Sequence, residues 1–378
     1  MPIPHGQNGF DHSMNIQLKN LKKKWQSLLF SLFIIGLLSA CASETPTLLP
    51  TLTITTIAET EAIAETQTPT AVMSPTPTLA ELGSPGNPIS IGYVLTPDET
   101  EAIEAAEEIA VLISADTDYA VESAIYPDFQ SLSSAVKNGD VDLFWLKPLE
   151  YIYLNWESAA QVLLATNHLG VYAYGVQFLA NEDRNFQIYY DPEINESTGT
   201  AEEALQQFAG TRPCFINSSS IPGYFVPQGL LENASTPTQD PVFTYSYNAT
   251  IRALFIQGIC DFGVSYALIG NPLNDNDIVQ NLPDAQEKIK VIWQSEGIIP
   301  NINLSTSPSL PTNVQFIIQE AVLDLPLNPV GLSLLSSALK EEIGALKTVQ
   351  DTFYNQLRIA ILPLELDLEA VTQGTPAP

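Results

Sequence analysis

The chain has 378 residues, and its 43 acidic residues outnumber its 14 basic ones to give a formal net charge of −29. An excess of negative charge this large argues against nucleic acid and anionic lipid as principal partners. The sequence has only three histidines and contains no His-Glu-x-x-His, Cys-x-x-Cys, Gly-x-Ser-x-Gly, Walker or Gly-x-Gly-x-x-Gly motif. We therefore expect neither an enzyme nor a metal or cofactor site.

Residues 1–40 have the pattern of a secretory signal peptide. Lysines at positions 19–24 lead into the uncharged apolar run 28–38, and small residues follow before Cys41. The run is shorter than the roughly 20 residues of a membrane-spanning helix. The ending Leu-Ser-Ala-Cys resembles the lipobox of bacterial lipoproteins, which implies that Cys41 is lipidated and becomes the first residue of the mature protein.

Two alternatives remain open for this region. It could be a signal anchor with a chance cysteine, and translation could begin at Met14 rather than Met1, which gives a shorter basic head. One acidic and four basic residues precede Cys41, which leaves 42 acidic against 10 basic residues and a net charge of −32 in the mature chain. A lipid would then hold the protein at a membrane, while the charge keeps it soluble.

Residues 41–88 are predicted to form a disordered tether. The segment contains 12 threonines and 7 prolines but no aromatic residue, lysine or arginine. A segment of this composition cannot bury enough apolar surface to offset the entropy lost on ordering. A largely polyproline-like chain of this length reaches on the order of 100 Å.

From Ile89 onward the sequence alternates strand and helix patterns. Thr96 and Glu99, with a proline between them, form a capping box that predicts a helix start, and Asn138-Gly139 predicts a helix end. Strand, helix and strand in succession imply parallel pairing and an α/β layer. The predicted elements are a strand over 89–94, a helix from 96 to about 112, a strand over 119–125, a helix over 128–137, a strand over 141–145 and a helix from 148.

The alternation restarts after a long apolar and aromatic strand over 171–180, which suits a crossing from one lobe to another. The two blocks together extend over about 260 residues, which is large for one α/β core and natural for two lobes. The elements of the second block are a helix over 200–208, a strand over 213–216, a helix over 223–231, a strand over 242–246, a helix over 249–257 and a strand over 260–265. Helices are expected again over 314–323 and 335–347.

Three stretches of the sequence carry a family resemblance. The first, at 129–151, includes Asn-Gly-Asp-Val-Asp-Leu-Phe-Trp-Leu-Lys-Pro; the second, at 212–227, includes Ser-Ser-Ser-Ile-Pro-Gly-Tyr; the third is Gly-Ile-Cys-Asp-Phe-Gly at 258–263. In this order and spacing they resemble the phosphate/phosphite/phosphonate family of ABC-transporter substrate-binding proteins, over about residues 89–325. The resemblance implies a type II periplasmic-binding fold of class α/β, with two lobes, two hinge crossings and a ligand closed between them.

This fold suggests a domain organisation for the chain. Lobe 1 is expected over residues 89–178 and again, with C-terminal helices, over 268–348. Lobe 2 is expected over 179–267, and residues 349–378 are expected to be a C-terminal extension.

Two cysteines are candidates for a disulfide. Cys214 and Cys260 both fall on predicted strands of lobe 2 that flank the serine loop, and thiols of an exported protein meet an oxidising compartment. We predict a disulfide between them. The alternative is two free cysteines buried in the core.

Ligands of open α/β sheets bind beyond the carboxyl ends of the strands, so we expect a site between the lobes. Trp145 and Lys147 follow a strand of lobe 1, and the serines at 218–220 precede a helix of lobe 2, where free N–H groups and hydroxyls suit an anion. Structural roles remain open for these residues, as core side chains, a solvated lysine and a polar loop. The predicted substrate-binding residues are Phe129, Trp145, Lys147, Tyr174, Ser219, Ser220, Gly223, Tyr224 and Asn248.

The sequence departs from the family pattern at this site. Ile221 and Pro222 replace part of the family's Ser-Thr-Ser loop, Asn248 stands where many members carry a histidine, and Phe129 stands where a tyrosine is frequent. Each change removes a hydrogen-bond donor or a positive charge. The resemblance therefore implies a small oxyanion or related polar solute that is held less electrostatically than in typical relatives.

The resemblance also implies a function. The protein is expected to capture a small-molecule solute and to deliver it to an ABC permease that reads the closed form. We expect an extracytoplasmic monomer, anchored to the membrane by the lipid on Cys41, with no nucleic-acid partner. Two alternatives keep the fold: a sensor that presents its closed form to a membrane receptor, and a structural lipoprotein with a degenerate pocket. A hydrolase is a further alternative, but no nucleophile has a visible base partner.

Overall fold

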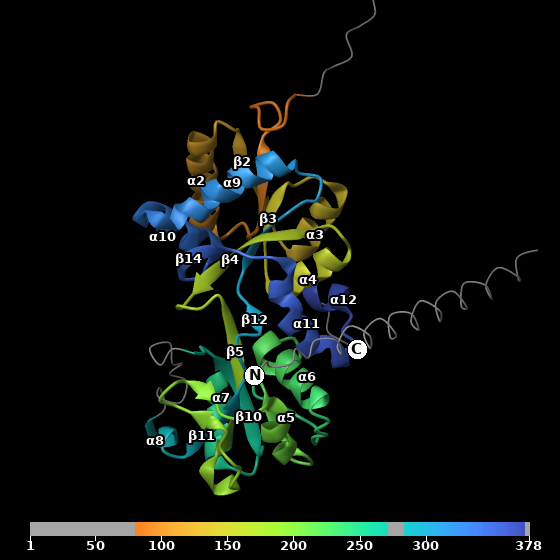
Figure 1. Cartoon of the computed structure of the whole chain (residues 1–378), viewed down its shortest axis with the longest axis vertical. Helices are drawn as coiled ribbons and strands as arrows, with labels where there is room; N and C mark the ends of the chain where they lie inside the picture. Colours follow the sequence, from red (N-terminus) through yellow and green to blue (C-terminus); the bar gives the residue numbers. More distant parts are fainter. Residues whose placement is uncertain (1–79, 271–282, 375–378) are drawn as a thin grey trace, which may run out of the picture. The chain divides into compact units, whose positions relative to one another are not determined.

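The computed structural model describes residues 80–270 and 283–374, which form two lobes, each built on its own β-sheet (Figure 1). The expected signal peptide, Cys41 and most of the expected tether lie outside the described residues. In the described part of the chain no single helix is long and apolar enough to cross a membrane, although the bent pair Thr312–Leu327 and Pro329–Leu339 passes by length and composition alone.

Lobe 1 is built on a six-stranded sheet in the order β14-β4-β13-β3-β1-β2. β1 pairs in parallel with β2 and β3, as the alternation of strands and helices predicts, whereas β13 and β14 run antiparallel to β4. Buried side chains of α2, α9 and α10 pack on one face, and those of α3 and α4 belong to a different apolar cluster. The strands are β1 (Ile89–Val94), β2 (Val121–Tyr126), β3 (Leu143–Leu146), β4 (Gln161–His168), β13 (Asn303–Thr306) and β14 (Ile343–Thr348), and the helices are α2 (Thr100–Thr117), α3 (Phe129–Asn138), α4 (Pro148–Trp156), α9 (Thr312–Asp324) and α10 (Pro329–Leu339).

Local sequence signals account for the helix ends of lobe 1. Asp128 caps α3 by accepting the N–H of Ser131 at 2.8 Å, and Gly139 ends it in the left-handed conformation, as predicted. α2 begins later than predicted, because the Glu99 carboxylate accepts the N–H of Thr96 (2.7 Å) in a turn that precedes the helix.

The helix predicted over 335–347 is wrong in its second half. α10 ends at Leu339, and after Lys340, which adopts the left-handed conformation, the chain returns as β14 alongside β4. This pairing satisfies the backbone of β14 and buries Ile343 and Leu346. Pairing with β4 therefore outweighs the helical pattern in the sequence of residues 340–347.

Lobe 2 is built on strands in the order β11-β5-β10-β8-β9, with β12 paired to β5 off this path. β5 is antiparallel to both β10 and β11, while β10, β8 and β9 run parallel. Phe178, Phe208 and Phe262 stack in its core, with 4.2 Å between the ring centroids of the last two. The elements are β5 (Ala173–Asn181), β6 (Tyr190–Asp191), β7 (Glu196–Ser197), α5 (Ala201–Leu205), β8 (Pro213–Phe215), α6 (Val226–Asn233), β9 (Val242–Phe243), α7 (Tyr247–Ile256), β10 (Phe262–Ala267), α8 (Pro283–Gln286), β11 (Ile289–Gln294) and β12 (Ile299–Pro300).

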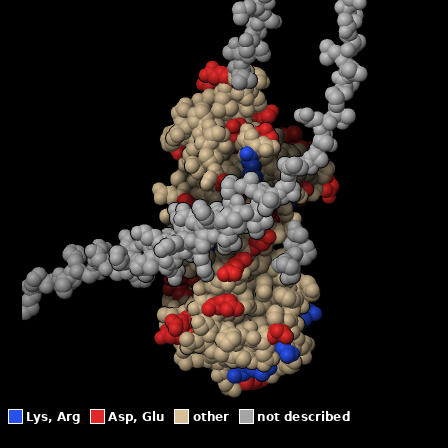
Figure 2. Space-filling view, turned by 90° about the vertical axis from the view of Figure 1, so that its right-hand side faces the viewer, with Lys and Arg blue, Asp and Glu red and all other residues tan. Residues whose placement is uncertain are grey.

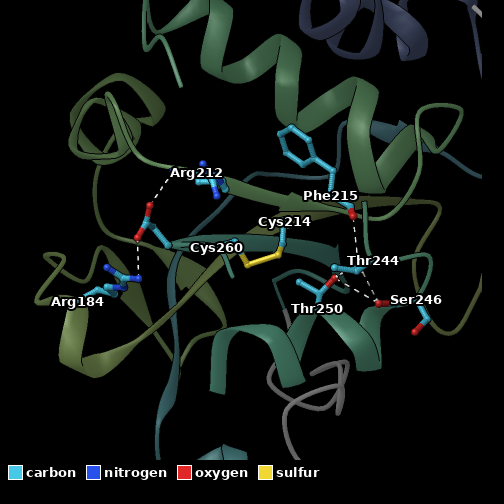
Figure 3. The surroundings of a disulfide bond; sticks show 9 residues. Arg184, Arg212, Cys214, Phe215, Thr244, Ser246, Thr250 and Cys260 are labelled. Carbon is cyan, nitrogen blue, oxygen red and sulfur yellow. Dashed lines mark hydrogen bonds and ion pairs between the residues drawn. A yellow bond between two sulfur atoms is a disulfide. The ribbon is translucent and has the colours of Figure 1, made fainter. Parts of the chain in front are cut away.

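A disulfide joins Cys214 of β8 to Cys260, which lies just before β10 (Figure 3). The two Cα atoms are 5.6 Å apart, and both side chains are buried. Beside the disulfide, Asp261 accepts the backbone N–H of Arg212 (2.8 Å) and forms an ion pair with Arg184 (2.7 Å). A covalent bond and an ion pair therefore fasten the start of β10 to its neighbours.

The lobe boundaries differ from the predicted ones. Residues 80–88, assigned to the tether, pack on lobe 1, where the Gly83 carbonyl accepts the N–H of Ala120 (2.7 Å). β5 lies wholly in the sheet of lobe 2, and β11 returns to that sheet although residues 268–348 were assigned to lobe 1. β5 and β11 pair with each other, and this pairing puts both strands in the sheet of lobe 2. The local sequence of a strand does not say which sheet the strand joins.

The two expected crossings between the lobes follow β4 and β12. The C-terminal segment, residues 349–374, adds a third link between the lobes. Its helix α11 (Asn355–Ile361) packs on α6 of lobe 2, and its helix α12 (Leu368–Thr372) packs on α4 of lobe 1. The α6–α11 approach is close, since a Cβ added at Gly229 would lie 1.8 Å from the carbonyl oxygen of Ala360. Residues 349–374 are therefore an integral part of the fold.

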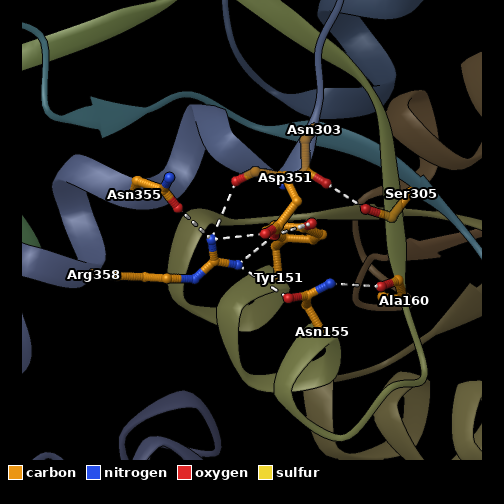
Figure 4. A network of polar contacts seen from close by, with 8 residues as sticks. All are labelled: Tyr151, Asn155, Ala160, Asn303, Ser305, Asp351, Asn355 and Arg358. Carbon is orange, nitrogen blue, oxygen red and sulfur yellow. Dashed lines mark hydrogen bonds and ion pairs between the residues drawn. The ribbon is translucent and has the colours of Figure 1, made fainter. Parts of the chain in front are cut away.

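A polar network joins the start of this segment to α4 (Figure 4). The Tyr151 hydroxyl donates to Asp351 Oδ1 at 2.8 Å. Arg358 donates to both carboxylate oxygens of Asp351 and to Asn155 Oδ1, the last at 3.0 Å. The ring of Tyr151 also packs against Tyr354, with 4.2 Å between centroids.

Candidate functional site

A cavity of about 440 Å³ lies between the two lobes. It is bounded by the β3–α4 junction, both hinge crossings, the turn before α6 and the start of α7. Its volume falls within the range of roughly 300–1,000 Å³ that is typical of small-molecule sites. The apolar part of the lining includes Val171, Ile221, Pro222, Leu268 and Ile302, and the polar part is Lys147, His168, Tyr174, Tyr247, Tyr266, Asn301 and Glu341.

Lobe 1 contributes the charged groups of the cavity. Lys147 caps α4 and is exposed, and its backbone N–H donates to Glu150 Oε2 (2.8 Å). His168 ends β4, with Nδ1 2.9 Å from the carbonyl oxygen of Glu342. Because a carbonyl only accepts, Nδ1 carries the proton and Nε2 is the remaining polar atom. Burial raises the pKa of Glu341, and the nearby His168 and Lys147 act in the opposite direction.

Three tyrosines form the polar part of the opposite wall. Tyr174 lies on β5, Tyr247 begins α7 after its capping residue Ser246, and Tyr266 lies on β10. The rings of Tyr247 and Tyr266 meet edge to face, with 5.3 Å between centroids. Burial raises the pKa of Tyr174, and it raises that of Tyr247 to about 12, so both hydroxyls are neutral near pH 7. They offer hydrogen bonds and ring surface but no charge.

Residues 91–354 match the family model described as "ABC transporter, phosphonate, periplasmic substrate-binding protein". The chain belongs to this family. It is thus an extracytoplasmic substrate-binding protein of an ABC transporter, and the resemblance seen in the sequence is confirmed. No curated protein matches the chain by sequence.

Solved structures of similar fold are distant in sequence. XAC2383 from Xanthomonas citri bound to chloride ion is 15% identical, with a TM-score of 0.50 and coverage of 75% of this chain and 98% of that one. The structure of XAC2383 bound to ATP has the same identity and TM-score, and covers 75% and 97%. PhnD1 from Prochlorococcus marinus, in complex with methylphosphonate, is 13% identical, with a TM-score of 0.45 and coverage of 73% and 97%. The predicted type II periplasmic-binding fold is confirmed.

In this substrate-binding protein Ser219 and Ser220 of the serine loop already have hydrogen-bond partners, and Ser220 also interacts with the Tyr247 side chain. The backbone N–H and the hydroxyl of Ser219 both donate to Asn217 Oδ1, at 3.0 and 2.9 Å. Ser220 Oγ accepts the N–H of Gly223 (3.0 Å), and the Ser220 carbonyl accepts the next two N–H groups. Ile221 and Pro222, at the start of a π-helical turn, line the cavity in their place.

Of the nine residues predicted for the site, Lys147 and Tyr174 line this cavity. Ser219 and Asn248 are exposed and Ser220 is half-buried. Gly223 is buried, and a Cβ there would lie 2.4 Å from Ile216 Cγ1. The remaining three are packed in apolar clusters: Phe129 against Tyr153, Tyr224 among Phe215, Phe225 and Phe243, and Trp145 in lobe 1.

Trp145 lines a second, smaller cavity of about 180 Å³ next to Tyr93. Burial raises the pKa of Tyr93, and its side-chain interaction with Trp145 acts in the opposite direction. Lys147 borders both this cavity and the larger one. Lys147 therefore lies between the smaller cavity, next to the end of β3, and the larger cavity between the lobes.

The sequence analysis missed Tyr247, Tyr266 and Glu341. Tyr247 directly precedes Asn248, and only the phase of α7 decides which of the two lines the cavity. Glu341 was hidden because its segment was predicted as helix, whereas it stands in the turn between α10 and β14. Over residues 80–270 and 283–374 no group of three or more His, Cys, Asp or Glu side chains is arranged to hold a metal ion.

Proposed function

We propose that this protein is a lipid-anchored substrate-binding protein of an ABC importer that captures one small polar solute in the cavity between its lobes. The observation that carries the proposal is the position of the cavity, which is lined from both lobes and from both hinge crossings. Closure of the lobes around a solute would bury it and present a changed surface to the permease. The lipobox pattern at Cys41 supports anchoring to the membrane.

Lys147 is the residue proposed to attract an anionic group of the solute. The chain has 43 acidic residues against 14 basic ones, and Figure 2 shows acidic side chains spread over the visible face with few basic ones. An anion therefore needs a local positive charge to remain in the cavity. His168 Nε2 is a second candidate donor when the ring is protonated.

The solute is proposed to be polar without being a densely charged oxyanion held by many donors. Ser219 and Ser220 already have hydrogen-bond partners, and Asn301 already donates to the carbonyls of Thr166 (3.1 Å) and Val171 (2.7 Å). A larger solute with a single anionic group suits this lining better. Among the described lining residues there is no serine or cysteine, which favours binding over nucleophilic hydrolysis.

The test is a binding screen on the mature chain. Phosphate, phosphite, methylphosphonate, alkylsulfonates and polar amino compounds are added singly, and a rise in melting temperature is followed by calorimetric measurement of Kd. Lys147→Ala should weaken binding of an anionic hit by about 1–3 kcal/mol, because a buried anion loses its partner. Lys290→Ala, on β11 and away from the cavity, is the matched control and should bind like wild type.

Two results would overturn the proposal. If Lys147→Ala binds an anionic hit as tightly as wild type, Lys147 has no part in the site. If no solute of the panel stabilises the protein, the structural-lipoprotein alternative gains over the transport function.

A further inference from the structure

The cavity contains a carboxylate, which is unexpected in a site for an anion. Glu341 is half-buried and lines the same space as Lys147. A carboxylate held close to an oxyanion repels it, whereas a buried carboxylate is stabilised by a cation that joins it. The polar wall of the cavity therefore favours a solute that brings positive charge of its own.

Three tyrosines line the same cavity as Glu341. Tyr174 lines the cavity together with Glu341 and Tyr247, and it is near enough to both to interact with them electrostatically. Tyr247 in turn packs edge to face against Tyr266. Tyrosine rings attract cations through their π-electrons, and a partly desolvated site strengthens this attraction. The apolar residues Ile221 and Pro222 complete the lining with surface that suits alkyl groups.

We propose that the solute carries a positively charged organic nitrogen, which lies against Tyr174, Tyr247 and Tyr266 with Glu341 as its counter-ion. An anionic group, where the solute has one, lies at Lys147. The ligand class is thus an alkylammonium compound or a zwitterion. This inference rests on the proposed function, because it concerns the same cavity.

The experiment compares compounds that differ only in the charge on one atom. The pairs are choline with 3,3-dimethyl-1-butanol, glycine betaine with 3,3-dimethylbutanoate, and 2-aminoethylphosphonate with propylphosphonate. In each pair carbon replaces nitrogen with little change of shape. Melting temperature and calorimetric Kd are measured on the mature chain. At least one nitrogen compound should bind about tenfold or more tightly than its carbon partner.

Variants then assign the effect to the residues named. Glu341→Gln should weaken the nitrogen compound about tenfold and should not weaken its carbon partner, whereas Glu342→Gln, the exposed neighbour, should change neither. Tyr247→Phe, which keeps the ring, should retain the preference for nitrogen, and Tyr247→Leu should lose it. The melting temperature of each ligand-free variant shows whether it is folded.

The outcomes separate this inference from the proposed function. If oxyanions without nitrogen bind and every nitrogen compound fails, or if carbon partners bind equally well, the inference is wrong and the transport function stands. The inference also fails if Glu341→Gln binds the nitrogen compound like wild type. If neither oxyanions nor nitrogen compounds bind, both proposals fail together.

Discussion

Two residues of opposite charge, Lys147 and Glu341, line the cavity of this acidic protein. Lys147 and Glu341 interact with one another across the cavity edge, and His168 lies near enough to influence Glu341. Burial raises the pKa of Glu341 although these two basic groups act in the opposite direction, so the charge of this carboxylate is not fully compensated. A ligand that brings a charge of opposite sign to such a buried group stabilises the site.

Glu341→Gln is expected to raise the stability of the ligand-free protein near pH 7. The pKa of Glu341 is raised on folding, so the folded state holds its proton at pH values where the unfolded state has lost it. Stability therefore falls as pH rises from the unfolded pKa through the folded one, and stays lower above. The variant removes this loss, by less than about 1 kcal/mol because solvent screens a half-buried group.

Urea denaturation at pH 7 and pH 3.5 measures this effect. The variant should exceed wild type at pH 7 and match it at pH 3.5, where both states of the wild-type carboxyl are protonated. The groups that influence Glu341 are Lys147 and His168, and both are the same in the variant and in wild type. Glu342→Gln serves as the control. A variant less stable than wild type at pH 7 would contradict the expectation.

At the scale of elements, the disulfide ties two neighbouring strands of lobe 2. Cys214 and Cys260 are separated by 46 positions along the chain, and a bridge over a loop of this length contributes about 2–4 kcal/mol in chain-entropy terms. Reduction, or Cys214→Ser with Cys260→Ser, should lower the free energy of unfolding by that amount. Urea titrations with and without reductant measure the change, and the double variant should not respond to reductant.

The contact between α6 and α11 offers a second prediction at this scale. Gly229→Ala would place a methyl group 1.8 Å from the backbone oxygen of Ala360, so the backbone must move. We expect a loss of about 1–3 kcal/mol and faster proteolytic cleavage within residues 350–374. Gln228→Ala, whose side chain bonds Glu232 on the same helix, is the control. Equal cleavage in the two variants would show that α11 does not depend on this contact.

For the whole molecule, the decisive question is where the protein resides. Cys41→Ser should yield a protein without lipid on its mature N-terminus, released from the detergent phase in which the wild type partitions. The reason is that only Cys41 of the lipobox pattern provides a thiol for the lipid. Mass spectrometry of the N-terminal peptide is the measurement. A wild-type N-terminus that is unmodified and begins elsewhere would end the lipoprotein hypothesis.

Features that depend on neighbouring residues could be predicted from the sequence. The strand β1, the ends of α3 at Asp128 and Gly139, and the capping box at Thr200 follow from local hydrogen bonding and backbone preference. The ordered motifs at 129–151, 212–227 and 258–263 led to the family, because they combine several such units at fixed spacing.

The side chains that face the cavity could not be predicted in this way, because contacts between distant parts of the chain select them. Tyr247 rather than Asn248 lines it because of the phase of α7, and Glu341 reaches it because β14 pairs with β4 instead of continuing α10. The C-terminal segment likewise becomes a link between lobes only through contacts with α6 and α4. These features depend on contacts between residues far apart in the chain, and no local pattern of hydrophobicity or capping encodes them.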